Sequence, residues 1–412
     1  MSDSDREFEI VLWGASGFTG KLTAEYLLRK HGASGGLRWA IGGRNQQKLE
    51  RVRDELAEET GVDCDALPIL VGDGDDGGFL QSLALRTRVV CTTVGPYAKY
   101  GSKLVEACAS TGTDYCDLTG EVHWMARMIE AHAGAAEASG ARIVFTAGFD
   151  CIPSDLGVYF TQREMIAREG APASRIELRV AVFNGGASGG TIASMLTMLE
   201  EAGEDPQVMR VMNEPYSLNP KDRQTGPDAA EKLAPRYDEA FGQWVAPFVM
   251  AGINTKVVRR SNALLDFRYG RDFRYDEAML MGSGAAGMAK AGATAFGSAA
   301  TMGVMSIGSL RPMISGQLPQ PGDGPTREEQ ERGSFDLLLR ATSGHGVELR
   351  TRVRGDRDPG YGSTSKMLAE SALCLARDEL AAAGGMHTPA SAMGDALLAR
   401  MPDAGVMFEV EG

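Results

Sequence analysis

The feature that most constrains the fold is an apolar segment, residues 8–13, that runs directly into a turn with a glycine at every third position. These glycines are Gly14, Gly17 and Gly20, and residues 21–30 carry apolar side chains at helical spacing. A strand, a glycine turn and a helix in this order are typical of a dinucleotide-binding unit. The first glycine allows the tight turn, the second admits a pyrophosphate, and the third lets the helix pack closely. An ordinary strand, turn and helix without a ligand is the alternative.

The N-terminus of such a helix presents free N–H groups to phosphates. We therefore expect the cofactor to contact every residue of the turn, namely Gly14, Ala15, Ser16, Gly17, Phe18, Thr19 and Gly20.

The end of the next strand, residues 37–41, indicates which dinucleotide binds. An NAD-specific chain would place Asp or Glu there, against the ribose hydroxyls. This chain has Arg44 instead, with Asn45 and Lys48 beside it. A guanidinium offers a planar fork of donors that suits a phosphate, so we predict NADP(H). A solvated surface arginine is the alternative.

Length and charge limit the classes of function. A chain of 412 residues is too long for one compact core, so we expect two domains. The net charge of -13 and the lack of any Lys/Arg run argue against a nucleic-acid partner, which leaves small ligands. The six cysteines lack metal-binding spacing, so we expect reduced, buried thiols and no metal site. The polar N-terminal segment does not resemble a secretory signal, and we expect a cytoplasmic protein.

Residues 291–310 lie between Lys290 and Arg311 without a single charge. Their length would just span a bilayer, but their many small residues make a membrane-spanning helix unfavourable. We expect a close-packed or mobile helix of a second domain. Peripheral attachment to a membrane or lipid body is the alternative.

Alternating strand-like and helix-like segments predict a parallel sheet in the first part of the chain. The predicted strands are residues 8–13, 37–41, 67–71, 88–93, 114–118 and 142–146, and the predicted helices are residues 21–30, 46–56, 78–85, 101–110 and 121–138. We therefore predict an α/β fold, a Rossmann doubly wound parallel sheet with an inserted α+β second domain.

The pattern changes after residue 150. Strands are predicted at residues 175–183, 264–275, 335–342 and 347–354, helices at 156–167, 191–200 and 363–380, an irregular stretch at 203–245, and an exposed loop at 316–332. We expect an NAD(P)-binding domain at residues 1–153, a substrate domain at 154–358, and a C-terminal segment, 359–412, whose helix returns to the first domain.

Several segments together resemble the saccharopine dehydrogenase-like oxidoreductases, and within them the branch of trans-acting enoyl reductases. These segments are residues 14–20, 42–45, 93–97, 115–121, 148–155 and 360–367. The resemblance implies an NAD(P)-binding Rossmann domain with an inserted α+β domain. In the enoyl reductase branch it implies reduction of a carbon–carbon double bond in an acyl chain made by polyketide or fatty-acid machinery.

The predicted site lies where strands end at the carboxyl edge of the sheet. Thr93, Val94, Gly95 and Pro96 follow the fourth strand and are expected near the nicotinamide, and Asp73 follows the third strand and is expected near the adenine. Tyr97 is a candidate proton donor, with an aromatic ring that merely closes the crevice as the alternative. Asp150, after the sixth strand, is the second candidate catalytic residue.

Other polar residues in these motifs have structural interpretations. Cys151 resembles a thiol nucleophile, but no histidine lies in a motif that would pair with it, so we expect a buried structural cysteine. Ser154 and Asp155 are expected to cap the following helix, and Glu121 is expected to cap the helix that it begins.

The predicted function is therefore NADP(H)-dependent reduction of an apolar, acyl-type substrate by hydride transfer. One alternative is a saccharopine-type amino-acid dehydrogenase, which would need converging cations, with Arg175, Arg179 and Arg268 as candidates. Another is a cofactor-binding, lipid-associated protein without turnover. A carrier-bound substrate and a homodimer remain open.

Overall fold

The computed structural model describes residues 6–186, 189–306 and 324–411. Its first sheet has seven parallel strands in the order β13-β6-β5-β4-β1-β2-β3. The strands are β1 (Phe8–Trp13), β2 (Trp39–Gly43), β3 (Ile69–Val71), β4 (Thr87–Thr92), β5 (Asp114–Cys116), β6 (Arg142–Val144) and β13 (Gly385–His387). All six strands predicted for this part of the chain are present, and β13 is an addition from the C-terminal segment.

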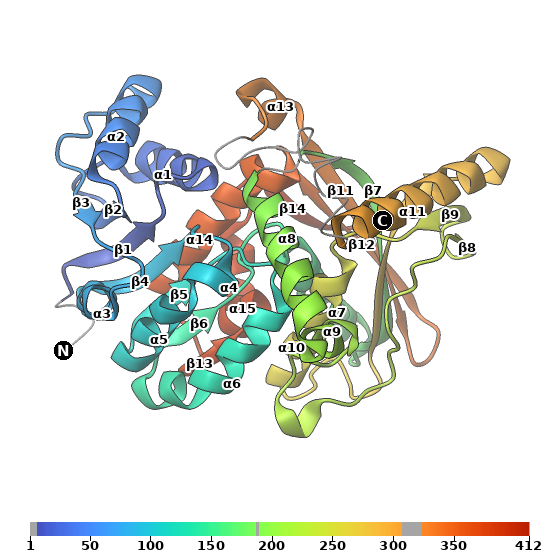
Figure 1. Cartoon of the computed structure of the whole chain (residues 1–412). Coiled ribbons are helices and arrows are strands. Elements are labelled where there is room, and N and C mark those ends of the chain that lie inside the picture. The colour runs from blue at the N-terminus through green and yellow to red at the C-terminus, as the bar shows by residue number, and fades with distance from the viewer. Residues whose placement is uncertain (1–5, 187–188, 307–323, 412) are drawn as a thin grey trace.

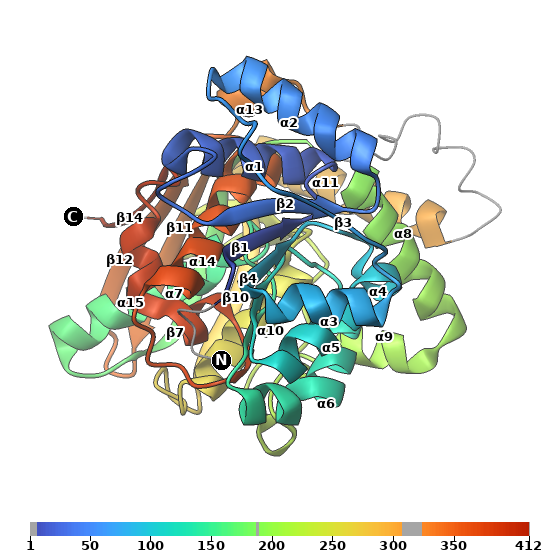
Figure 2. The same cartoon turned by 90° about the vertical axis from the view of Figure 1, so that its left-hand side faces the viewer.

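Helices cover both faces of the first sheet (Figure 2). One face carries α1 (Phe18–His31), α2 (Gln46–Thr60) and α14 (Thr364–Arg377), and the other carries α3 (Gly77–Leu85), α5 (Ser102–Thr111) and α6 (Val122–Ser139). The central strands β1 and β4 are apolar and almost fully buried because both of their faces are covered. The predicted doubly wound Rossmann fold is therefore confirmed.

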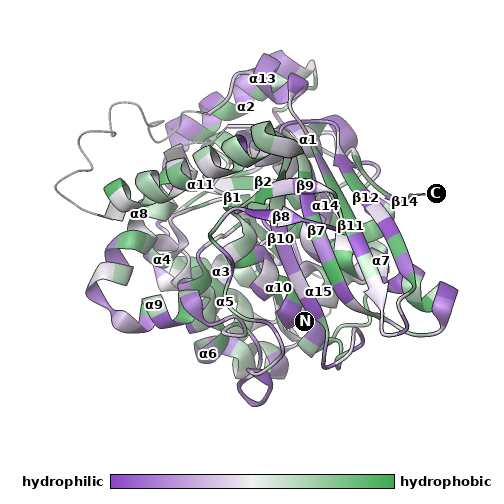
Figure 3. Ribbon diagram, turned by 90° about the vertical axis from the view of Figure 1, so that its right-hand side faces the viewer, coloured by the Kyte–Doolittle hydropathy of each residue, from purple (hydrophilic) through white to green (hydrophobic). Residues whose placement is uncertain are grey.

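The second sheet also has seven strands, in the order β14-β12-β11-β7-β10-β9-β8. These are β7 (Ala173–Asn184), β8 (Arg236–Asp238), β9 (Gln243–Ala246), β10 (Arg274–Gly282), β11 (Ser334–Ser343), β12 (Glu348–Gly355) and β14 (Val406–Val410). Buried and half-exposed residues alternate along β11, which is typical of a sheet with one covered face. Figure 3 shows this alternation as stripes of opposite hydropathy along β11 and β12.

The covered face of the second sheet packs on α7 (Ile152–Glu169) and α10 (Ala251–Leu264). Helix α15 (Pro389–Arg400) contacts both α7 and α14, and thereby connects the helices of the two sheets (Figure 1). The insertion of a mixed α+β region is as predicted.

Three predictions about the second region need correction. The strand predicted at residues 264–275 begins only at Arg274, the first residue of β10, because α10 runs to Leu264 and the chain then turns through Asp266 and Phe267 at positive φ. The stretch predicted as irregular, 203–245, contains α9 (Pro206–Asn213), a 3-10 turn at Lys221–Arg223, and strands β8 and β9. Within the predicted loop 316–332, residues 316–323 lie outside the described residues, and α13 (Arg327–Arg332) is a helix with a Thr326–Glu329 capping box.

The C-terminal segment does more than predicted. Helix α14 packs on β4 and β5 of the first sheet, and a π-helical turn, Pro359–Ser363, precedes it. After α14, β13 joins β6 in the first sheet and β14 joins β12 in the second. The segment therefore contributes a strand to each sheet, and the proposed division at residues 153 and 358 stays a prediction.

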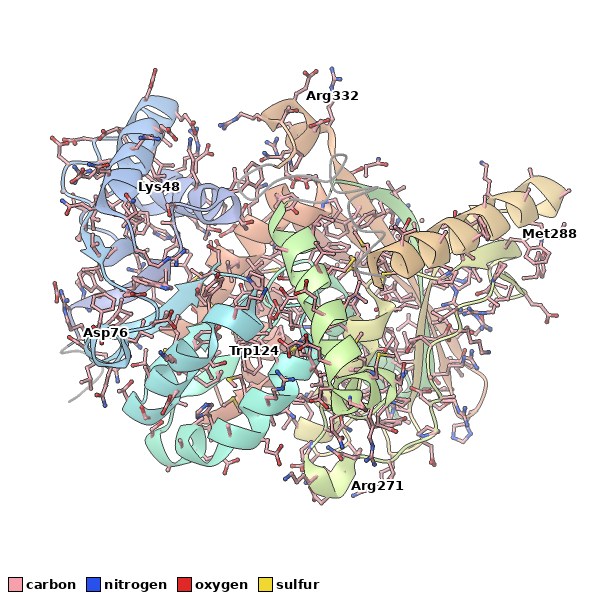
Figure 4. The ribbon with its side chains drawn as sticks, viewed as in Figure 1. Lys48, Asp76, Trp124, Arg271, Met288 and Arg332 are labelled. Carbon is pink, nitrogen blue, oxygen red and sulfur yellow. The ribbon has the colours of Figure 1, made fainter. Side chains whose placement is uncertain are left out.

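Two apolar helices lie beside each other at one side of the molecule. These are α8 (Gly189–Glu204) and α11 (Gly284–Ser306), and α11 covers the described part of the uncharged stretch 291–310. Figure 4 shows Met288 on α11, far from Lys48 on α2. Within the described residues, neither α11 nor any other helix combines the length and the hydropathy that a membrane crossing requires.

Candidate functional site

The glycine turn after β1 has the geometry of a phosphate-binding turn. Gly14 has a φ of 97° and its N–H donates to the Gly42 carbonyl oxygen at 2.8 Å. A Cβ on Gly20 would lie 2.2 Å from the Gly14 carbonyl oxygen, so only glycine lets α1 start this close to the turn. A Cβ on Gly17 would meet nothing nearer than 3.4 Å, and no side chain caps α1 there. Packing therefore does not require glycine at position 17, where a close ligand would.

The remaining residues of the turn surround this opening. Ala15 is buried, Ser16 is exposed, and Phe18 and Thr19 are half-buried at the start of α1. The Phe18 ring packs edge-on against the Tyr361 ring with a centroid separation of 5.3 Å. The Tyr361 hydroxyl in turn lies 3.0 Å from the Thr191 hydroxyl of α8. The turn is thus joined to the π-helical turn and to α8.

Arg44 follows β2 and is exposed, with its guanidinium 5.6 Å from the centre of the Tyr100 ring. It forms no ion pair within the part of the chain that the structure describes, so its donors are available to an anion. Asn45 has a structural task, because its Oδ1 accepts from the Lys48 N–H at 3.0 Å and caps α2. Asp73 is exposed after β3, where its Oδ1 accepts from the Asp75 N–H.

The end of β4 packs directly on the glycine turn. The Thr93 hydroxyl donates to the Gly14 carbonyl oxygen at 3.2 Å, and the Val94 side chain occupies the space that a Cβ on Gly14 would need. Gly95 lies next to Ser194 of α8, and Pro96 precedes the short helix α4 (Tyr97–Tyr100). An open glycine turn, a helix N-terminus and an unpaired arginine together fit a dinucleotide with a 2′-phosphate.

Tyr97 lies inside the first region rather than at an open edge. Its side chain is buried, its hydroxyl donates to the Thr92 carbonyl oxygen at 3.2 Å, and the Leu118 N–H reaches that hydroxyl at 3.4 Å. Burial, followed by the Asp117 carboxyl, raises the pKa of Tyr97 well above its usual range. These contacts favour a structural role, and the proton-donor role stays a prediction that the geometry does not support.

Glu121 caps a helix other than the one predicted. Its two carboxylate oxygens accept from the backbone N–H groups of Tyr97 and Ala98, each at 2.8 Å, so it caps α4. It makes no side-chain cap at the start of α6.

Asp150 lies between β6 and α7 and is half-buried. Burial, followed by the charge of Glu277 on β10, raises the pKa of Asp150 to about 7. Burial also raises the pKa of the Cys151 thiol well above its usual range, so this thiol is not activated as a nucleophile. Asp155 does not cap α7, because its carboxylate accepts from the Ser261 hydroxyl and the Ala390 N–H and thereby connects α7 to α10 and α15.

Comparisons with known proteins agree with this geometry. Residues 10–144 match the family described as Saccharopine dehydrogenase NADP binding domain. A Mycobacterium tuberculosis protein assigned by name to the trans-acting enoyl reductases is 44% identical over 99% of both chains. The trans-acting enoyl reductase of Mycobacterium leprae is 40% identical, also over 99% of both chains. The chain belongs to the saccharopine dehydrogenase-like oxidoreductase family. Saccharopine dehydrogenase (L-Glu forming) from Saccharomyces cerevisiae shares the fold, with a TM-score of 0.51 at 12% identity over 98% of this chain and 99% of that one.

This oxidoreductase is an NADP(H)-dependent enzyme, which agrees with the cofactor that we predicted from the sequence. Of the three cations considered for an amino-acid substrate, two line the same cavity and the third lies elsewhere. Arg175 and Arg179 lie on the outward face of the second sheet, beside a cavity of about 790 Å³, where both pair with Asp276. Arg268 instead stacks over the Tyr159 ring at 5.7 Å.

The sequence did not lead us to expect three residues around the site: Tyr100, Ser194 and Glu277. Tyr100 and Ser194 are brought to the site by tertiary packing, and no local pattern would have marked them. A sequence pattern does mark Glu277. Tyr275, Glu277 and Met279 occupy alternate positions along β10 and therefore share its covered face, where a carboxylate is unusual. Placing the strand at residues 264–275 hid this alternation.

Proposed function

We propose that the enzyme is an enoyl reductase that reduces a carbon–carbon double bond in the acyl chain of a carrier-bound lipid or polyketide intermediate. Relatives bearing that name are similar over the full length of the chain, at 40–44% identity. The observation that carries the proposal is the apolar character of the helix beside the end of β4. A chemically matched substrate for such a surface is an acyl chain.

Helix α8 supplies that surface. The Ser194 hydroxyl oxygen lies 3.5 Å from the position of a Cβ on Gly95 and acts to lower the pKa of the Glu121 carboxyl, which puts one face of α8 beside the end of β4. Met198, four residues on, lies on the same face. The apolar side chains of α8 are half-buried rather than enclosed, and they are Ile192, Met195, Leu196, Met198 and Leu199. Burial of apolar area needs few fixed charges, which suits an acyl chain.

The chemistry requires a hydride at the β carbon and a proton at the α carbon of the double bond. NADPH, when bound, supplies the hydride and is oxidised to NADP⁺. Asp150 supplies the proton in this proposal, because its carboxyl is half-buried and its pKa of about 7 keeps a transferable proton near neutral pH. Water then returns a proton to the Asp150 carboxylate.

A saccharopine-type amino-acid dehydrogenase is the second candidate. A dicarboxylate substrate demands paired Arg or Lys side chains. The three candidates are engaged elsewhere, two with Asp276 and one with a tyrosine ring. A protein that binds NADPH without turnover is the third candidate, and the same experiment separates all three.

The test titrates the NADPH-loaded protein with α,β-unsaturated acyl thioesters of increasing length, and with saccharopine in parallel. Nicotinamide absorbance reports turnover and calorimetry reports binding. Each methylene buried is worth about 0.8 kcal/mol, so the affinity should rise roughly fourfold per methylene. Turnover of saccharopine alone would establish the amino-acid function, and tight NADPH binding without oxidation by any substrate would establish the third.

Two variants test whether the acyl chain of the substrate binds along α8. Met198→Asp should weaken binding of long thioesters and leave short ones nearly unchanged, because it places a charge beside the distal part of the chain. Val249→Asp is the matched control, because Val249 is an exposed valine that is not on α8. Equal losses in both variants would contradict an acyl surface on α8.

A further inference from the structure

The cavity of about 790 Å³ on the outward face of the second sheet has no part in the proposed reaction. It forms where the chain at the end of β8 folds back over that face. There the Arg179 Nε donates to the Asp238 Oδ2 at 2.5 Å, and the Arg179 guanidinium lies 5.7 Å from the centre of the Phe241 ring. Its described lining residues come from β7, β8, β10, β11 and the chain beside them, and none comes from the glycine turn or the end of β4. Figure 3 shows these four strands on this side of the molecule.

Three charged side chains in the wall of this cavity are more than nine-tenths buried. Arg179 is 1% exposed, and Glu177 and Asp238 are each 7% exposed. Removing charges from water is costly, and well-packed apolar residues often hold strands together as well or better. Stability alone therefore does not account for these charges, whereas a polar ligand in the cavity would.

Two arginines lie directly opposite each other at one end of the cavity. Arg175 of β7 is in register with Arg274 of β10, and Thr342 of β11 is in register with Arg175 on its other side. All three residues line the cavity. Neighbouring strands are only about 4.8 Å apart, so two cations in register repel each other. This row of three residues, which we call the arginine row, therefore favours a bound anion.

The acidic side chains nearby leave several arginine donors unused. The Arg175 Nη2 lies 2.9 Å from the Glu177 Oε1 and 3.3 Å from the Asp276 Oδ1, which leaves its Nε and Nη1 without an acidic partner among the described residues. Arg274 is exposed, and its side chain forms neither an ion pair nor a hydrogen bond within the part of the chain that the structure describes. Arg340 pairs with Glu177 at 2.9 Å, yet its Nε is buried without a hydrogen-bond partner there.

The rim of the cavity carries charges of both signs. Lys232 is an exposed cation, and Glu239 and Asp272 are exposed carboxylates. The two carboxylates repel an occupant that is negative along its whole length. They can accept hydrogen bonds from hydroxyl groups, so the cavity as a whole suits a small molecule with one anionic end and a hydroxyl-bearing remainder.

A phosphate group matches the arginine row better than a carboxylate does. Guanidinium groups bind phosphate oxygens bidentately. A phosphate monoester presents three acceptor oxygens, which is enough for Arg175, Arg274 and the Thr342 hydroxyl together. A carboxylate has only two oxygens.

We propose that this cavity is a second binding site of the enzyme, which holds a small phosphorylated molecule with its phosphate between Arg175, Arg274 and Thr342. The phosphate offsets the repulsion between the two arginines, and hydroxyl groups of the ligand face Glu239 and Asp272. Because the site belongs to the second sheet, its ligand does not compete with NADPH. The inference does not depend on which substrate the enzyme reduces.

The direct test is calorimetry on enzyme already saturated with NADP⁺, so that the cofactor site is filled. The probes are inorganic phosphate, glycerol 3-phosphate and glucose 6-phosphate. We expect at least one of the two esters to bind more tightly than inorganic phosphate, because only the esters carry hydroxyl groups. Arg274→Ala should weaken that binding roughly ten- to hundredfold.

Arg271→Ala is the matched control. Arg271 is exposed and lies three residues before Arg274, but it does not line the cavity and its guanidinium stacks over the Phe267 ring at 4.1 Å. The control removes the same charge and should leave the affinity for the ester unchanged. Thr342→Val removes one donor and should weaken ester binding by less than Arg274→Ala does.

Melting temperatures distinguish a binding role of Arg274 from a structural one. Without ligand, Arg274→Ala breaks no ion pair and relieves the repulsion with Arg175, so the melting temperature should rise by about 1 °C. With saturating ester the order should reverse, because only the unchanged protein gains full stabilisation from the ligand. A structural Arg274 would lower the melting temperature under both conditions.

Four results would overturn the inference. They are no binding of any of the three probes, equal affinity for inorganic phosphate and both esters, an equal loss of affinity in Arg271→Ala and Arg274→Ala, and an affinity for NADP⁺ that falls in Arg274→Ala by the same factor as that for the ester. None of these measurements needs an acyl substrate, so the outcome is separate from that of the proposed enoyl reduction.

Discussion

Replacing Arg44 with aspartate should reverse the preference of the enzyme for NADPH over NADH. Arg44 is exposed, and its guanidinium contacts the Tyr100 ring but forms no ion pair within the described residues. Its removal therefore costs the fold little, and the effect should appear in binding. Charge-assisted hydrogen bonds to a phosphate are worth about 1.5–3 kcal/mol, which is roughly a ten- to hundredfold change in affinity for NADPH. The new carboxylate can accept from the ribose hydroxyls of NADH, which raises that affinity.

The assay is the dissociation constant of each dinucleotide, measured by nicotinamide fluorescence at fixed ionic strength. Arg51→Asp is the control for long-range charge, because Arg51 is also exposed and lies on α2, beyond the end of β2. Tyr100→Ala should weaken NADPH binding less than the loss of Arg44 does, since an exposed cation–π contact is worth about 0.5–1 kcal/mol. Equal affinities of the unchanged protein for the two dinucleotides would refute the argument, as would the same selectivity in Arg44→Asp.

Three further predictions concern the fold and the thiol. Gly20→Ala should abolish dinucleotide binding and lower the melting temperature, because its Cβ would lie 2.2 Å from a backbone oxygen. Gly134→Ala, in the helix α6 with nothing within 4 Å, is the control and should stabilise the protein by about 0.5–1 kcal/mol. Cys151→Ser should keep most turnover and lose stability in urea, whereas a covalent intermediate trapped on this residue would contradict its structural role. Glu370→Ala should cost about 1–3 kcal/mol in urea unfolding, because the Tyr26 hydroxyl and Lys30 lose a buried acceptor while Lys30 keeps Asp403, and a cost under about 0.5 kcal/mol would show that water replaces these bonds.

The sequence predicted those parts of the structure that depend on local patterns. Local sequence predicts β1 and β4 because a parallel strand that is buried on both faces must be apolar. It predicts the turn after β1 because such a tight turn requires glycine. The sequence failed where tertiary contacts decide. We expected Tyr97 at the open carboxyl edge of the first sheet. Instead Glu121, which lies 24 residues later in the sequence, accepts from the N–H of Tyr97 at the start of α4, and the Tyr97 side chain is buried. Asp150 was expected because it follows a strand, whereas Glu277, whose charge raises the pKa of Asp150, belongs to β10, which begins ten residues after the start of the strand that we predicted.

The last strands of the chain bear on how the protein is synthesised. β13 borders β6, and β14 borders β12, so each sheet is completed by a strand that is synthesised after all of its other strands. The first sheet cannot be complete before residue 387 has left the ribosome, and the second cannot be complete before residue 410 has done so. Until then the nascent chain should expose unpaired strand edges, and a cell that makes this enzyme must shield them. Because the C-terminal segment contributes a strand to both sheets, its detachment removes an edge strand from each of them. We therefore expect the two sheets to unfold in one thermal transition.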